Sequence, residues 1–159
     1  MTNQTQFSRQ LIKGKIAELI FDQMLREAGG FTVLAFGYEN ILPELMLRQH
    51  DMKAEQTMEV IRRAPDFAVI NNTDHNVHLI EVKYRKQIRS SEILTFTTLM
   101  LESWKPSFLF LATPKGFYYG KVSDIVANKG KIEPLIHKQI SKSLQDRYVK
   151  LMNEFIGSN

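Results

Sequence analysis

Cysteine is absent from the 159 residues of this sequence, and long apolar runs are absent as well. Without cysteine the chain has no disulfide bond, no thiolate zinc ligand and no thiol nucleophile. The longest apolar run, Phe108 to Ala112, falls far short of the roughly 20 residues that span a membrane. The N-terminal residues are polar and lack the layout of a signal peptide. We therefore expect a cytoplasmic protein with no membrane partner.

Common catalytic sequence templates are missing too. The chain has no nucleophile elbow, no phosphate-binding P-loop, no dinucleotide-binding glycine motif and no zinc-protease motif. Its four histidines do not show the spacing of a metal site. With 5 Pro and 8 Gly, the sequence contains no linker rich in these residues and no internal repeat. The expected organisation is a single domain over residues 1–159.

The charge is unevenly distributed along the chain. Residues 1–80 carry 8 Lys and Arg against 10 Asp and Glu, whereas residues 81–159 carry 13 against 7, and the net charge is +4. The second half can present a basic surface to a polyanion, or its charge can simply keep the protein soluble.

Hydrophobic periodicity predicts the order of the elements. The first helix is expected from Ser8 to Ala28, with Ile12, Ile16, Leu19, Ile20 and Met24 at helical spacing. Strands are expected at 31–36, 66–70, 77–84, 107–113 and 117–122, the second and third forming a hairpin. Further helices are expected at 90–103, after Asp124, and through Ile136, Ile140, Leu144, Tyr148, Leu151 and Phe155. This order predicts an α/β fold with a central mixed sheet and helices on both faces.

The stretch from Asn40 to Arg63 allows two interpretations. Asn40 can cap a helix that has Pro43 in its first turn. Residues 58–63 can equally begin a strand. The sequence leaves this boundary open.

Three charged residues on the hairpin carry the chemical signal. Asp66 opens the first strand, and Glu81 and Lys83 share one face of the second because side chains alternate along a strand. Strand pairing can bring Asp66 beside Glu81, where two carboxylates repel each other unless a hard cation such as Mg²⁺ neutralises them. A lysine beside such a site can orient a water or stabilise charge on a phosphate.

Structural roles are also available to these residues. Asp66 can start a turn, Glu81 and Lys83 can form an ion pair on an exposed strand, and Glu18 can be a solvated helix residue. The apolar residues around Glu81 and Lys83 make that strand look buried, and buried charge is costly without a purpose. We therefore favour a functional site.

The segments Ala64-Pro65-Asp66-Phe67 and Leu79 to Arg85 resemble the core motif of the PD-(D/E)xK, or restriction-endonuclease-like, nuclease superfamily. Lys13 to Glu18 is similar to the start of archaeal-type Holliday-junction resolvases. The resemblance implies a restriction-endonuclease-like core in which Asp66, Glu81, the carbonyl of Val82 and Glu18 bind Mg²⁺, with Mn²⁺ as a substitute. It also implies that Lys83 is the catalytic lysine and Gln87 an auxiliary polar residue.

Basic residues near the motif are candidate contacts to DNA. Arg85, Lys86 and Arg89 follow it, and Arg62 and Arg63 precede it. Such cations supply affinity for phosphate without sequence specificity. The main hypothesis is a Mg²⁺-dependent nuclease hydrolysing DNA phosphodiester bonds with little sequence specificity, acting as a homodimer or with a protein partner. The alternative is a non-catalytic nucleic-acid-binding or assembly module that retains the fold.

Overall fold

The computed structural model describes residues 2–37, 59–60 and 63–157. In these ranges one five-stranded sheet has the order β1-β2-β3-β4-β5. The strands are β1 (Phe31–Ala35), β2 (Phe67–Asn71), β3 (Val77–Tyr84), β4 (Phe108–Thr113) and β5 (Gly116–Lys121). β3 and β4 run parallel, while the other neighbouring strands are antiparallel. The expected α/β class with a mixed sheet is confirmed.

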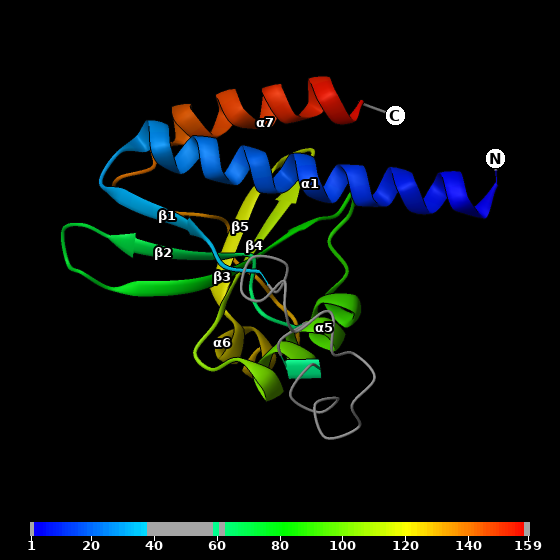
Figure 1. The fold of residues 1–159 in the computed structure, drawn as a ribbon, viewed down its shortest axis with the longest axis horizontal. Coiled ribbons are helices and arrows are strands. Elements are labelled where there is room, and N and C mark those ends of the chain that lie inside the picture. Colours follow the sequence, from blue (N-terminus) through cyan, green and yellow to red (C-terminus); the bar gives the residue numbers. More distant parts are fainter. Residues whose placement is uncertain (1, 38–58, 61–62, 158–159) are drawn as a thin grey trace, which may run out of the picture.

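Helices cover both faces of the sheet (Figure 1). α1 (Asn3–Ala28) and α7 (Lys142–Ile156) lie side by side over one face, and α5 (Ser90–Ser103) and α6 (Val122–Ala127) pack together over the other. β4 is buried on both sides, because Phe110 and Ala112 enter the α1 core whereas Leu109 and Leu111 enter the α5 core. The apolar run in the sequence is therefore an interior strand, between β3 and β5.

The first helix begins earlier than its predicted N-cap at Ser8. Thr2 caps it, with its hydroxyl oxygen accepting a hydrogen bond from the N–H of Thr5 at 3.3 Å. The apolar residues that recur at helical spacing are only partly buried, since Ile12 and Leu19 are 58% and 62% exposed. The sheet lies beneath the C-terminal half of α1 only (Figure 1), where Ala17, Ile20, Phe21, Met24 and Leu25 are buried. The N-terminal half extends past it.

Two further predictions need correction near the C-terminus. Asp124 lies in the first turn of α6, and Lys121 occupies the N-cap position. The last helix begins at Lys142, because the Ser141 hydroxyl accepts the N–H of Leu144 at 3.1 Å and caps it there. Ile136 and Ile140 therefore precede the helix, and Ile136 is 90% exposed.

Most of the ambiguous stretch 40–63, including Asn40 and Pro43, lies outside the described residues. Glu59 and Val60 are helical, so the alternative strand at 58–63 is wrong at these two positions. Within the described ranges, no helix is both long enough and apolar enough to cross a membrane.

Gly130 follows α6 and packs against the first turn of α5, and we expect Gly130→Ala to destabilise the protein strongly. Its φ is +88°, and an added Cβ would lie 2.0 Å from the Ser90 carbonyl oxygen. Left-handed strain and a backbone clash together predict a loss of about 3 kcal/mol, or roughly 10 °C in melting temperature by calorimetry. Gly116→Ala, where a Cβ meets nothing within 4 Å, is the control. Equal melting of the two variants would contradict this role.

Candidate active site

Asp66 is held at the point where the hairpin strands stop pairing. The β2–β3 register begins at Phe67 opposite Ile80, so β3 continues past the start of β2. The Asp66 side chain fills the missing position, with its Oδ2 accepting the N–H of Val82 at 2.8 Å. Its main-chain oxygen accepts the N–H groups of Phe36 and Gly37 at 2.8 and 3.2 Å. Asp66 is therefore fixed from both sides.

Glu81 and Lys83 lie on the opposite side of β3 from its core residues. Ile80 and Val82 enter the α1 core, while Lys83 Nζ lies 5.4 Å from the centre of the Phe96 ring of α5. Lys83 Nζ also donates to Glu81 Oε1 at 3.1 Å, and both side chains are mostly buried. The same-face ion pair that the sequence offered as a structural alternative is present, but both side chains are more buried than on an exposed strand.

Glu18 of α1 approaches the same place from the neighbouring layer. Lys15 Nζ donates to Glu18 Oε2 at 3.0 Å, one helical turn away. Burial is the main cause of the raised pKa of Asp66 and of Glu81, and the negative charge of Glu18 adds to it. The structure thus brings together residues from three separate parts of the sequence: Glu18, Asp66, and the pair Glu81 and Lys83.

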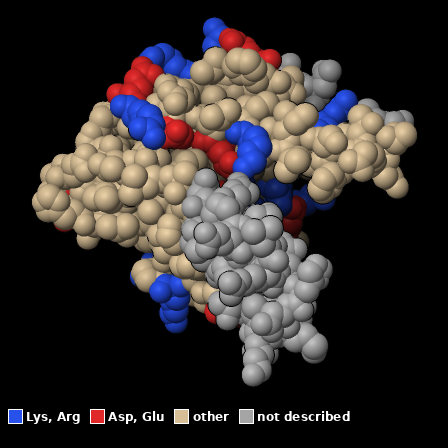
Figure 2. All heavy atoms as spheres, viewed as in Figure 1, with Lys and Arg blue, Asp and Glu red and all other residues tan. Residues whose placement is uncertain are grey.

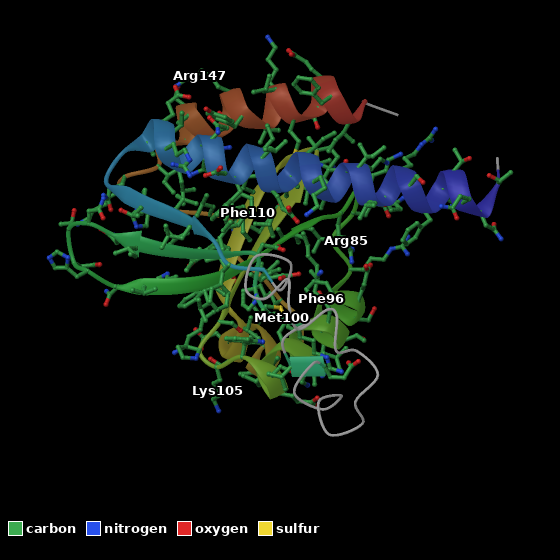
Figure 3. The ribbon with its side chains drawn as sticks, in the orientation of Figure 1. Arg85, Phe96, Met100, Lys105, Phe110 and Arg147 are labelled. Atoms are coloured by element: carbon green, nitrogen blue, oxygen red, sulfur yellow. The ribbon has the colours of Figure 1, made fainter. Side chains whose placement is uncertain are left out.

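These residues line one cleft of about 580 Å³ at the end of the sheet where β2 starts and β3 ends. One wall is the exposed half of α1, with Gln10, Leu11, Gly14 and Lys15. The other is α5, with Phe96, Leu99 and Met100. Figure 3 shows Arg85, Phe96 and Met100 along this second side, from the end of β3 onto α5.

The carboxyl groups of Asp66 and Glu81 both have pKa values above their ordinary range. Burial, followed by the like charge of Glu81, raises the pKa of Asp66 to about 8, against the hydrogen bond from Val82. Burial also raises the pKa of Glu81, although Lys83 opposes the shift. A cation between them would relieve this cost, because an opposite charge favours the ionised form.

The donor set fits a hard divalent cation, since carboxylate and carbonyl oxygens are the ligands that Mg²⁺ prefers. A strand residue directs its N–H and C=O to the same side. The carbonyl of Val82 therefore points toward Asp66, which binds the N–H of Val82. Over residues 2–37, 59–60 and 63–157, no three His, Asp or Glu side chains are already grouped closely enough to hold a metal. Ion binding would require the carboxylates to draw together, away from Lys15 and Lys83.

The described basic residues of the prediction, together with Gln87, lie in two places. Arg63 and Arg85 line the cleft, where Arg63 donates to Ser103 Oγ at 3.4 Å and Arg85 pairs with Glu92. Lys86, Gln87 and Arg89 lie on the exposed connection between β3 and α5 and do not line it. Arg62 lies outside the described residues.

Sequence reasoning missed most of the cleft walls. Gln10, Gly14 and Lys15 share a side of α1 with Glu18, and a spacing of three or four residues from Glu18 is the signal that could have found Gly14 and Lys15. Figure 2 shows charged side chains gathered along α1, where Arg26 also pairs with Asp22. Nothing in the sequence indicates the α5 wall in the same way. Apolar residues at helical spacing, such as Phe96, Leu99 and Met100, are typical of a buried helix face.

Comparison with known proteins finds no match for this chain among family models, curated proteins or solved structures. Its function is therefore inferred from the chemistry of the cleft.

Proposed function

We propose that this protein is a divalent-metal-dependent nuclease that hydrolyses DNA phosphodiester bonds, built on a restriction-endonuclease-like core. The observation that carries the proposal is the partly buried pair Asp66 and Glu81, both with raised pKa values, beside Lys83 in an open cleft. Buried like charges weaken a fold, so their convergence in a cleft is typical of a functional site.

Asp66, Glu81 and the carbonyl of Val82 would hold Mg²⁺ or Mn²⁺, with Glu18 as a further carboxylate. When bound, the ion would polarise the phosphate and lower the pKa of a water. Lys83, whose amino group lies 3.1 Å from Glu81 Oε1, stabilises negative charge on the phosphate and orients the attacking water. Asp66 keeps the end of β3 in place through its bond to Val82.

Positive side chains on the cleft walls support a polyanionic substrate. Lys15, Arg63 and Arg85 come from three different parts of the chain and all line the cleft. Contacts of this kind bind phosphates without reading bases, which agrees with little sequence specificity. Lys86 and Arg89 extend the positive charge along the exposed loop beyond Arg85.

The test is incubation of the protein with labelled linear, nicked, flapped, four-way and single-stranded DNA, in Mg²⁺, in Mn²⁺ and in EDTA. We expect divalent-dependent cleavage of at least one substrate and none in EDTA. Binding of DNA without cleavage in either ion would contradict the proposal and favour the non-catalytic nucleic-acid-binding module.

A further inference from the structure

Gly14 is a glycine that the fold of α1 does not require. A Cβ added at this position would meet no heavy atom within 4 Å, and Gly14 lies in the middle of a long helix. Glycine destabilises a helix interior relative to alanine, so Gly14 lowers the stability of α1 although close packing does not require a glycine there. Gly14 does line the cleft. The absence of a side chain leaves room for a ligand's own backbone to approach the helix closely.

Two exposed apolar side chains also line the cleft. Leu11, three residues before Gly14, is 57% exposed, and Leu99 across the cleft is 44% exposed. Phe96 lines the cleft on the α5 wall with Leu99, and Lys83 Nζ and Arg85 Cζ lie 5.4 and 5.6 Å from its ring centre. A site for phosphate alone needs no such surface, whereas the flat face of a nucleobase does.

Resting on the nuclease function proposed above, we infer that the cleft takes a single DNA strand, with its sugar–phosphate backbone crossing α1 at Gly14. One base then lies between Leu11 on the α1 wall and Phe96 and Leu99 on the α5 wall. In a duplex the base faces are covered by stacking, so these apolar side chains have no partner there. A single strand exposes them, and stacking on aromatic side chains binds any base.

The size and charge of the cleft agree with this substrate. Its volume of about 580 Å³ is that of a site for one small organic ligand, which suits a nucleotide or two. Lys15 on the α1 wall and Arg85 on the opposite side can contact the phosphates on both sides of that base. The free strand of a flap or an overhang presents the same groups as an isolated strand.

The experiment compares binding of a fluorescent single strand and of its blunt duplex by anisotropy, in Ca²⁺, with wild type, Gly14→Gln and Leu99→Ser. Ser143→Gln adds a side chain of similar size at an exposed position on α7 and is the control. We expect wild type to prefer the single strand about 10-fold, and each cleft variant to weaken single-strand binding about 10-fold. The control should bind as wild type does. Gly14→Gln should melt no lower than wild type, because glutamine is the better helix former.

Equal affinity of wild type for duplex and single strand overturns the inference. It is also overturned if Gly14→Gln and Leu99→Ser both bind the single strand with the same affinity as Ser143→Gln. Hydrolysis of bis(p-nitrophenyl) phosphate by the wild-type protein in Mn²⁺ is the separate test of the nuclease function. Hydrolysis without strand preference overturns the inference alone. Strand preference without hydrolysis supports the single-strand cleft and contradicts the nuclease.

Discussion

DNA cleavage is expected to fall about 10³-fold when Lys83 is replaced by methionine, with the fold retained. The Lys83 amino group lies 3.1 Å from Glu81 Oε1 and 5.4 Å from the centre of the Phe96 ring, so its charge is fixed beside the carboxylates. Methionine keeps an apolar stem of similar length against Phe96 and removes only the positive end. Because Lys83 acts on charge that develops during the reaction, the loss should appear in kcat rather than in KM.

Lys150→Met is the matched control, since Lys150 is exposed on α7 and does not line the cleft. Its cleavage rate in Mn²⁺ should equal that of wild type. Lys83→Met should still be stabilised by Mn²⁺ in a thermal melt, because Asp66 and Glu81 remain as ligands. Cleavage by Lys83→Met within about 10-fold of wild type would be too small a loss for a catalytic lysine.

The hairpin is the part of the site that the sequence predicts best. Alternation along a strand is strict, so placing Ile80 and Val82 in the core necessarily puts Glu81 and Lys83 on the other side. The position of Asp66 follows from the same pairing, since it stands next to the first paired residue, Phe67. Strand alternation and hairpin pairing are sufficient to place these three residues, because a short loop joins the two strands.

The contribution of α1 could not be derived in the same way. Its apolar residues occur on more than one side, and periodicity alone does not tell which of them meet the sheet. Leu19 fits the predicted stripe, yet it is exposed, whereas Phe21 and Leu25 outside that stripe are buried. The choice depends on where the sheet ends beneath the helix. The position of the sheet edge also creates the cleft, because the part of α1 that extends beyond the sheet forms one wall of the cleft.

Asp66→Asn is expected to make the ion-free protein more stable at pH 8 while removing its response to divalent ions. The pKa of Asp66 is raised to about 8 from 3.8 by burial and by the charge of Glu81. The folded state therefore binds a proton more tightly than the unfolded state does. This contribution to stability is complete below about pH 4 and is lost as the pH rises toward 8.

Asparagine has no charge to lose over that range, and its Oδ1 can still accept the N–H of Val82 as Asp66 Oδ2 does. In EDTA the variant should melt about 5–10 °C above wild type at pH 8, from roughly 2–3 kcal/mol. The two proteins should approach each other near pH 4. Asp146→Asn, at an exposed carboxylate paired with Lys142, should show no such pH-dependent gain.

Addition of Mn²⁺ at pH 8 should reverse the order of the two proteins. Wild type gains stability in proportion to the logarithm of the ion concentration, because the ion binds the folded carboxylates. Asp66→Asn lacks one of those carboxylates and should gain little. A variant less stable than wild type in EDTA at pH 8 would mean that the Asp66 charge supports the fold. A more stable variant that no longer responds to Mn²⁺ would mean that the Asp66 carboxylate destabilises the ion-free fold. Binding of a divalent ion would then offset this destabilisation.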